Sequence, residues 1–419
     1  MHRTYASTVL IAFLLFVPHF AFGACDLNAT TSNFAAQLSA AQPGQTVCLA
    51  TGNYGTFAGA NKSSPGVTIT AQSGATPTMG INFCSSAAVS WLTLDTITIP
   101  GGEICGPTNN VTFQNSHFTA ELDIYQSGGV YNNACSSCPA ISSSNIVFDN
   151  DLNDSASDPN ATGTFGGDIV FIKGPNGPTD PSAGITVKNS QFTSGCNDGI
   201  DVLGAGHGVT IGPGNVFHGL LQGSCANHVD SIQVSGTDVP GPTITGNYFY
   251  NDTTGMTSYD YANDGLINNN VMSGVIQDSL LIAGWDSSSV VEHNTVIGDQ
   301  IICGQTHEGN NCTAIIRNNI TRQFSVGGGT ATGQTPAYFD YNLCTSGSCD
   351  FGNNTAGPHS LSGTPTYVGG SSPTTYAGFA LTSGSLGQNA GSDGKDIGIN
   401  ATSTTGGPSA PTGLVAEVQ

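Results

Sequence analysis

The chain has 419 residues, of which 57 are glycine and only 8% are charged, and its formal net charge is −21. Ordinary globular domains carry about a quarter charged residues, so this surface must consist largely of Ser, Thr, Asn and Gly. Lys and Arg together number seven, and so few cations argue against nucleic-acid binding and against docking on an anionic membrane.

The N-terminus is typical of a secretory leader. Positive residues precede an apolar run at 9–17, and residues 21–23 (Ala-Phe-Gly) form a small-x-small cleavage site. We therefore expect residues 1–23 to be a signal peptide and the protein to be secreted, either extracellular or periplasmic. A lipoprotein box ending at Cys25 is the alternative, but lipidation of Cys25 would leave one of the twelve cysteines without a disulfide partner. No later stretch is long and apolar enough to span a membrane.

The cysteines divide into six pairs of sequential neighbours. Disulfides between such neighbours would each staple a coil or a loop, and they imply an oxidising compartment. The predicted pairs are Cys25 with Cys48, Cys84 with Cys105, Cys135 with Cys138, Cys196 with Cys225, Cys303 with Cys312, and Cys344 with Cys349. For Cys135 and Cys138 a metal site is the alternative, but no second Cys or His pair completes a zinc site.

Residues 24–60 are predicted to cap a repetitive fold. A short helix carrying Phe34 and Leu38 on one face is followed by a strand at 46–49 and a turn at 52–55. A polar cap of this kind shields the core and the unpaired backbone of the first coil.

A repeated seven-residue phrase dominates the centre of the chain. It begins with Asp and ends with Gly, and its copies align at 168–174, 198–204, 230–236 and 278–284, with a weaker match at 257–263. A second landmark, Asn closely followed by an apolar residue, recurs at Asn247, Asn270, Asn294, Asn319 and Asn342, at intervals of 23, 24, 25 and 23 residues. Self-similarity at this period predicts a solenoid whose coils stack around a continuous core.

The solenoid is expected to occupy residues 61–402. Near its end, the segment from Phe379 to Gly398 is predicted to form a closing strand and tight turns. Residues 403–419 are rich in Gly, Pro, Ser and Thr, which predicts a flexible tail or linker.

Three features together resemble the secreted right-handed parallel β-helix proteins of the pectate lyase-like superfamily. They are the phrase 41–49 (AQPGQTVCL) with 52–54 (GNY), the Asn-x-apolar coils, and the closing Asp-Ile-Gly at 396–398. The resemblance covers nearly the whole mature chain. It implies an all-β fold, a single right-handed parallel β-helix with a short N-terminal capping helix, and a protein that cleaves polysaccharide in a groove along one sheet; the fold alone does not establish that function.

The aligned phrases, taken as rungs of one parallel sheet, separate inward from outward positions. The inward positions are Ile200, Val202, Ile232, Val234, Tyr259, Tyr261, Leu280 and Ile282. The opposite parity brings Asp201, Gln233 and Asp260 to the outer face. Asp201 and Asp260 would then lie two rungs apart, about 9 to 10 Å, at the upper edge of the spacing in inverting glycosidases.

A second acidic row stands where the strands begin. Its members are Asp168, Asp198, Asp230 and Asp278. Two carboxylates about 5 Å apart either raise each other's pKa or bind a shared cation. In the first case one of them stays protonated near neutral pH and can act as a general acid. Asp198, Asp201 and Asp230 are therefore candidates both for catalysis and for binding Ca²⁺. His228 and His207 are placed to orient a carboxylate or to transfer a proton.

Three further residues complete the candidate site. Lys173 is the one basic residue within the strand phrases, and in a lyase it would be the base, with Asp-bound Ca²⁺ acidifying the proton beside a uronate. Gln233 on the outer column and Trp285 after the fourth rung are candidates for substrate binding, the tryptophan by stacking on a sugar. For Asp168 and Asp278 a structural role as turn formers is the alternative.

Residues 197–198 (Asn-Asp) and 206–208 (Gly-His-Gly) are similar to elements of polygalacturonases. The departures are that the family's Asp pair is Asn-Asp here and that no Arg-x-Lys element follows. A pectate-lyase-type arginine base is also missing from the groove.

Three functions are compatible with this pattern. A secreted hydrolase would use carboxylates among Asp198, Asp201, Asp230 and Asp260, helped by His228 and His207, on a glycan that the scarcity of cations suggests is neutral. A Ca²⁺-dependent lyase would cleave a uronate-containing glycan with Lys173 as base. A non-catalytic, adhesin-like solenoid would only bind glycan. In each case the predicted partner is a polysaccharide, and no oligomeric state is predicted.

Overall fold

The computed structural model describes most of the chain between residues 25 and 400. The described ranges are 25–125, 144–154, 170–173, 184–196, 198–203, 208–223, 225, 228–235, 241–259, 262–306, 309–326, 335–350, 352 and 354–400. The predicted signal peptide, the pair Cys135 and Cys138, and the predicted tail lie outside these ranges.

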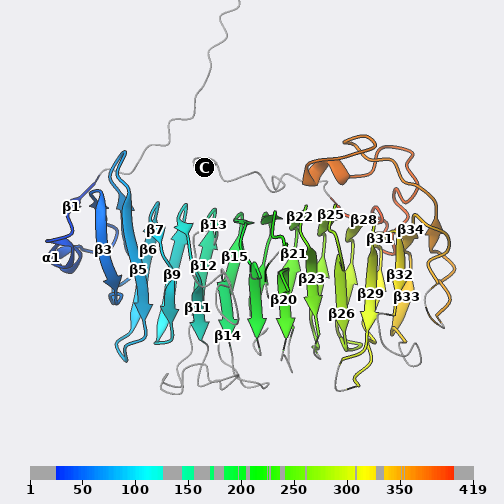
Figure 1. Cartoon of the computed structure of the whole chain (residues 1–419), viewed down its shortest axis with the longest axis horizontal. Coiled ribbons are helices and arrows are strands. Elements are labelled where there is room, and N and C mark those ends of the chain that lie inside the picture. Colours follow the sequence, from blue (N-terminus) through cyan, green and yellow to red (C-terminus); the bar gives the residue numbers. More distant parts are fainter. Residues whose placement is uncertain are drawn as a thin grey trace, which may run out of the picture.

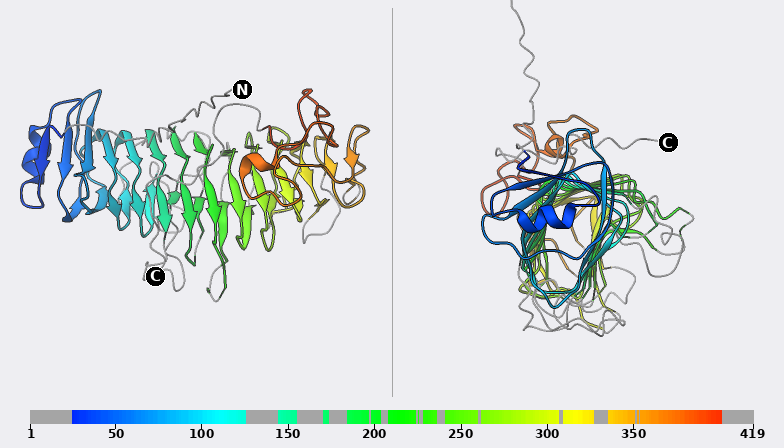
Figure 2. Two further views of the ribbon diagram at one scale, coloured as in Figure 1. Left: turned by 90° about the horizontal axis from the view of Figure 1, so that it is seen from above. Right: turned by 90° about the vertical axis from the view of Figure 1, so that its left-hand side faces the viewer.

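The molecule is a long coil of short parallel strands wound around one axis (Figure 1). Each complete coil contributes three strands, one to each of three sheets that run along the axis. Helix α1 (Phe34–Ala40) lies across the N-terminal end of the coil (Figure 2), where it covers the first rung of the core with the buried Leu38. Among the described residues no helix is long and apolar enough to cross a membrane.

The first sheet has 13 strands in chain order. They are β1 (Leu27–Ala29), β2 (Thr46–Leu49), β4 (Val67–Ala71), β6 (Val89–Asp95), β9 (Thr108–Gln114), β12 (Ser144–Asp149), β15 (Ile185–Lys188), β18 (Val209–Ile211), β21 (Thr243–Thr245), β24 (Leu266–Asn268), β27 (Val290–Glu292), β30 (Ile315–Arg317) and β33 (Tyr338–Asp340).

The other 22 strands are joined at the N-terminal end by β3 (Gly52–Phe57) and β5 (Pro77–Phe83), and then separate into two sheets. The second sheet holds β7 (Thr98–Ile99), β10 (His117–Phe118), β13 (Leu152–Asp154), β16 (Gln191–Thr193), β19 (Val216–His218), β22 (Tyr248–Tyr250), β25 (Val271–Ser273), β28 (Thr295–Ile297), β31 (Ile320–Thr321), β34 (Leu343–Cys344) and β35 (Leu361–Ser362). The third sheet holds β8 (Gly102–Ile104), β11 (Leu122–Tyr125), β14 (Val170–Lys173), β17 (Ile200–Leu203), β20 (Asp230–Ser235), β23 (Thr254–Ser258), β26 (Leu280–Ala283), β29 (Gln300–Gly304) and β32 (Gln323–Ser325).

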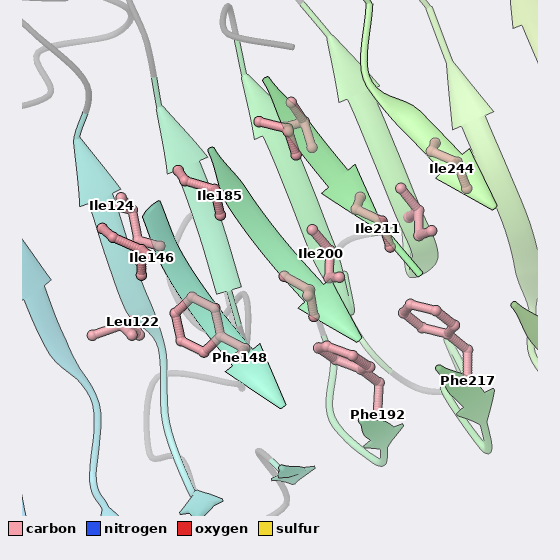
Figure 3. Close-up of a cluster of buried hydrophobic side chains, with 14 of the residues drawn as sticks. Leu122, Ile124, Ile146, Phe148, Ile185, Phe192, Ile200, Ile211, Phe217 and Ile244 are labelled. Atoms are coloured by element: carbon pink, nitrogen blue, oxygen red, sulfur yellow. The ribbon is translucent and has the colours of Figure 1, made fainter. Parts of the chain in front are cut away.

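Alternate residues of each strand fill the interior, and equivalent residues of successive coils stack on one another (Figure 3). Phe192, Phe217 and Phe249 form one such stack, with ring centroids 4.6 and 4.7 Å apart. The predicted inward residues Ile200, Val202, Ile232, Val234, Leu280 and Ile282 are all fully buried. Period-two alternation therefore identified the core face of β17, β20 and β26 correctly.

The repeated asparagines form a buried ladder at the corner between the first and second sheets. The Nδ2 atom of Asn270 donates to Oδ1 of Asn294 and to the backbone oxygen of Ile244, at 3.0 Å each. The same pattern links Asn215, Asn247, Asn270, Asn294, Asn319 and Asn342. Each side chain thereby satisfies backbone groups that a sharp corner would otherwise leave unpaired inside the protein.

Five predicted disulfides are confirmed, namely Cys25–Cys48, Cys84–Cys105, Cys196–Cys225, Cys303–Cys312 and Cys344–Cys349. The predicted closing strand is wrong. Tyr376–Phe379 is a 3-10 helix (η1), and the segment from Thr364 to Asn400 folds back over the second sheet (Figure 1). Its apolar residues are sparse because they cover one outer face and do not fill the central core.

Candidate functional site

A row of polar residues stands where strands of the third sheet begin, and we call it the strand-head row. Asp230 pairs with Thr254, and the register of the adjoining strands places Asp198 on the rung before and Asp278 and Asp299 on the rungs after. Each residue lies two positions ahead of an inward apolar residue. The carboxylate of Asp230 nevertheless lies with the outer column, because it accepts hydrogen bonds from Thr257 and Gln233.

Asp198 and Asp230 are bound to each other and nearly enclosed. Oδ1 of Asp198 accepts a hydrogen bond from the backbone nitrogen of Asp230 at 2.7 Å, and the two residues are 5% and 1% exposed. Oδ2 of Asp230 also accepts from Oγ1 of Thr257 at 2.7 Å. Gln233, with its amide assigned the orientation that its partners require, donates to Oδ2 of both acids at 3.2 Å. The candidate substrate-binding Gln233 thus lies among the carboxylates.

His228 lies over this pair of carboxylates. Its Nδ1 atom is 3.1 Å from Oδ2 of Asp230 and 3.9 Å from Oδ1 of Asp198, while its side chain is 56% exposed. A buried carboxylate that accepts from Nδ1 fixes the tautomer in which Nε2 can accept a proton. The sequence prediction that His228 joins Asp198 and Asp230 agrees with this arrangement.

Tyr259 is a member of the site that the sequence pattern assigned to the core. Its ring centroid is 6.2 Å from that of His228, and it forms a hydrogen bond with the Thr257 side chain. Burial, followed by the charge of Asp230, raises the pKa of the Tyr259 hydroxyl well above its usual value. Tyr259 therefore keeps its proton across the neutral range.

The predicted register of the rung after β20 is wrong by three residues. Thr257 pairs with Gln233 and occupies the outer position predicted for Asp260, and Met256 fills the core where Tyr259 was expected. The described strand therefore gives the outer position of this rung to Thr257 and not to an acid. The physical reason is that the true rung, TGMTS, carries the apolar methionine but lacks the Asp that marked the other copies.

Asp201 lies on the predicted outer column, opposite Gln233, but only 4% of it is exposed. The prediction that it faces solvent is therefore wrong, because strand parity fixes the side of the sheet and not what packs over that side. Asp260 and His207 lie outside the described residues, as does the side chain of Lys173, whose backbone pairs with Leu203. Their roles stay predictions.

Trp285 does not stack on a ligand, and this prediction is wrong. The side chain is fully buried, and its Nε1 atom donates to Oγ of Ser258 at 2.8 Å. A Cβ atom on Gly265 would lie 2.5 Å from the indole ring. A large ring with an internal hydrogen-bond partner is stable as a core residue.

The acidic row extends beyond the predicted residues. Asp278 is followed on the next rung by Asp299, whose Oδ2 accepts from the backbone nitrogen of Ser279 at 2.9 Å. Burial, then Asp299 and Asp230, raise the pKa of Asp278. The Asp-x-Ile spacing at 299–301 repeats the start of the earlier phrases and could have identified Asp299 from sequence.

The donor set of the cluster does not fit the predicted calcium site. Asp198, His228 and Asp230 each offer one atom within 4.8 Å of the others. Ca²⁺ prefers six to eight oxygen ligands, whereas these residues supply two carboxylates and an imidazole nitrogen, and Asp201 is not among them. The described arrangement also presents the exposed imidazole of His228 beside the hydroxyl of Tyr259.

Comparison with known proteins agrees with the fold. A family model described as the right handed beta helix region matches residues 169–356. No curated protein sequence matches the chain. A pectate lyase structure is 14% identical over 87% of this chain and 90% of its own, with a TM-score of 0.39.

Two other solved structures give similar values. An alginate lyase from Paenibacillus sp. strain FPU-7 is 16% identical over 63% of this chain and 98% of its own, with a TM-score of 0.40. The A-module of the Azotobacter vinelandii mannuronan C-5 epimerase is 12% identical over 80% and 92%, with a TM-score of 0.43. The family model and the parallel sheets confirm the predicted fold, a right-handed parallel β-helix.

Proposed function

We propose that this protein is a secreted polysaccharide lyase that cleaves a uronate-containing glycan by β-elimination, with His228 as base and Tyr259 as acid. The observation that carries the proposal is the pairing of His228 and Tyr259, 6.2 Å apart between ring centroids, beside the buried Asp198 and Asp230. The leader and five disulfides support a location outside the cytoplasm.

The proposed step requires one proton acceptor and one donor. Nε2 of His228 takes the proton from the carbon beside the uronate carboxyl, the electron pair forms a carbon–carbon double bond, and the glycosidic carbon–oxygen bond breaks. The leaving oxygen takes the hydroxyl proton of Tyr259. Asp230 and Asp198 stabilise the imidazolium that forms, and Thr257 links the carboxylate of Asp230 to Tyr259.

Hydrolysis by two carboxylates fits the site less well. In such hydrolases both carboxyl groups flank the scissile bond and act directly on it or on water. Asp198 and Asp230 are buried, and their oxygens accept from Thr257, Gln233 and a backbone nitrogen. Their burial and hydrogen bonds therefore support a role in holding His228 over direct contact with a sugar.

The charge of the uronate carboxylate must also be offset for its neighbouring carbon to lose a proton. Lys173 on β14, one rung before β17, is our proposal for that cation. His207, in the segment after β17, is proposed as a second polar contact to the substrate.

The first test is a panel of uronic and neutral polysaccharides, followed both by ultraviolet absorbance of the new double bond and by reducing ends. We expect absorbing product from an acidic substrate, with and without a chelator. His228→Ala should lower the rate at least about a hundredfold, and Tyr259→Phe should have a similar effect, since each removes one proton transfer.

His359→Ala is the matched control. His359 is 55% exposed and its Nδ1 atom is 2.8 Å from Oδ2 of Asp340, the same arrangement as at His228, but Asp340 belongs to the first sheet. Activity should be unchanged in this variant. Reducing ends without absorbance would establish hydrolysis instead, activity lost with the chelator would establish a metal-dependent site, and binding without any product would identify a non-catalytic glycan-binding solenoid.

A further inference from the structure

Almost every described basic side chain has a partner. The partnered groups are Lys62 with the backbone oxygens of Leu38 and Ala41, Lys188 with Asp149, Arg317 with Glu292, and Lys395 with Asp393. Arg322 differs from these, because its Nε atom is buried without a hydrogen-bond partner in the described part of the chain. In a protein with a net charge of −21, a guanidinium that forms no ion pair with any described carboxylate calls for an explanation.

Arg322 occupies the end of the strand-head row. Its backbone nitrogen donates to the oxygen of Asp299 at 2.9 Å, and the following Gln323 pairs with Gln300. The row therefore passes from Asp198 and Asp230 through Asp299 to a guanidinium. From Asp230 to Arg322 there are four rungs, about 19 Å at the usual spacing of strands.

We propose that Arg322 binds the carboxylate of an acidic sugar, several units along the glycan from the sugar at His228. This inference rests on the proposed function, because it assigns a second contact to the same substrate. A guanidinium binds a carboxylate through two parallel hydrogen bonds. The Nε atom is buried and closed to a ligand, so the terminal guanidinium nitrogens of the half-buried Arg322, which form no ion pair with a carboxylate of the described residues, would hold the ligand carboxylate.

The neighbouring side chains favour an acidic sugar at this end of the row. The charges of Asp278 and Asp299 repel an anionic glycan in the middle of the row. Such a glycan therefore needs a cation at another point of the row to fix its position along the sheet. Beyond Asp299 the surface changes to amides, with Nε2 of Gln323 donating to Oε1 of Gln300 at 3.2 Å. Arg322 is thus the place along the described row where an anionic group meets positive charge and polar donors.

The test separates binding from turnover. Oligouronates of increasing length are titrated by calorimetry into the His228→Ala variant, with and without Arg322→Gln. We expect Arg322→Gln to weaken binding roughly ten- to hundredfold, the range for a hydrogen bond to a charged group, but only for oligomers long enough to span four rungs. Carboxyl-reduced oligomers should bind both proteins equally, and Arg322→Lys should restore only part of the affinity.

Arg317→Gln is the matched control, because Arg317 lies on the first sheet and is paired with Glu292 at 2.8 Å. Equal affinity for long acidic oligomers with and without the Arg322→Gln substitution would overturn the inference. If Arg322→Gln weakens the binding of acidic oligomers while the wild-type protein forms no unsaturated product, the subsite stands and the proposed reaction fails.

Discussion

At the scale of single residues, one position of the asparagine ladder is occupied by an acid. The corner carries Asp151 on the coil of β12, between Ser116 and Ser190 on the adjacent coils, and it carries Asn from Asn215 onward. Asp151 is fully buried; Oδ1 accepts from the nitrogen of Ser116, while Oδ2 has no partner among the described residues. Burial raises the pKa of this carboxyl well above its usual value. An ionised Asp151 is therefore unfavourable in the folded protein.

We expect Asp151→Asn to stabilise the protein by about 1 to 3 kcal/mol at neutral pH, the usual cost of an unsatisfied buried polar group. The added Nδ2 can donate as Nδ2 of Asn215 does to the oxygen of Val187. The folded pKa of Asp151 lies above its unfolded value near 4, so wild-type stability falls as pH rises from about 4 toward the folded pKa. The gain in melting temperature should thus be large at pH 7 and small near pH 4. An equal gain at both pH values would contradict this explanation.

Single residues also show what sequence could predict about the site. The pattern placed Asp198, Asp230 and His228 together because all three lie close to phrases that share one register. It could not predict that Asp201 and Trp285 are buried, since that depends on which segments pack over the sheet. Tyr259 was assigned to the core because one weak copy of the phrase was aligned three residues too late.

At the scale of elements, regular rungs were predictable and loops were not. Alternating apolar residues identify β17, β20 and β26, and the asparagine spacing identifies the corner of each coil. The loop between β19 and β20 contains His228, and its sequence has no periodic pattern of apolar residues. Its position is set by particular bonds, such as the one from the nitrogen of Leu220 to Oδ1 of the buried Asp252.

The disulfide Cys196–Cys225 ties this loop to the turn before β17. Cys196 stands two residues ahead of Asp198, and Cys225 stands three residues ahead of His228, so the bond joins the two chain segments that carry these site residues. We expect replacement of both cysteines by serine to lower kcat more than it raises KM, because His228 loses its fixed position over Asp230. On the chain-entropy model the stability cost is about 3 to 4 kcal/mol for this loop of 29 residues.

The pair Cys303–Cys312 provides the control for that measurement. It closes a loop of nine residues after β29, away from His228. Its removal should cost some stability and leave kcat unchanged at temperatures where the protein stays folded. Equal losses of kcat in both double variants would show that the Cys196–Cys225 bond acts only on stability.

At the scale of the whole molecule, the repeat period predicted a solenoid but not the segment that folds back over it. Residues 364–400 cover part of the second sheet, where Tyr376 and Phe379 pack with Tyr248 and Val271. The hydroxyl of Tyr376 donates to the oxygen of Asn269 at 2.6 Å, across 107 residues of sequence. Contacts between residues so far apart in sequence produce no repeating pattern in the sequence. For that reason the sequence pattern predicts a closing strand and not this docked segment.

Close approach at Gly398 allows this segment to dock. Its nitrogen donates to the oxygen of Asn318 at 2.7 Å, its φ is +84°, and a Cβ atom there would lie 2.6 Å from Cδ1 of Ile320 and 2.7 Å from Oγ1 of Thr295. Gly394 has a similar φ of +77°, but a Cβ atom there would meet nothing within 4 Å. Alanine at either position bears the cost of the left-handed conformation, about 1 to 2 kcal/mol, and only Gly398→Ala adds a clash with the coil.

We therefore expect Gly398→Ala to lower the melting temperature clearly more than Gly394→Ala does. It should also speed hydrogen exchange at the Ile399 amide, which donates to Oγ1 of Thr295 at 3.1 Å. The candidate site lies on the third sheet, so activity at low temperature should be the same in both variants. Two variants with the same melting temperature would mean that the segment tolerates displacement from the coil at Gly398. In that case its docking would depend on its other contacts with the coil, such as those of Tyr376 and Phe379.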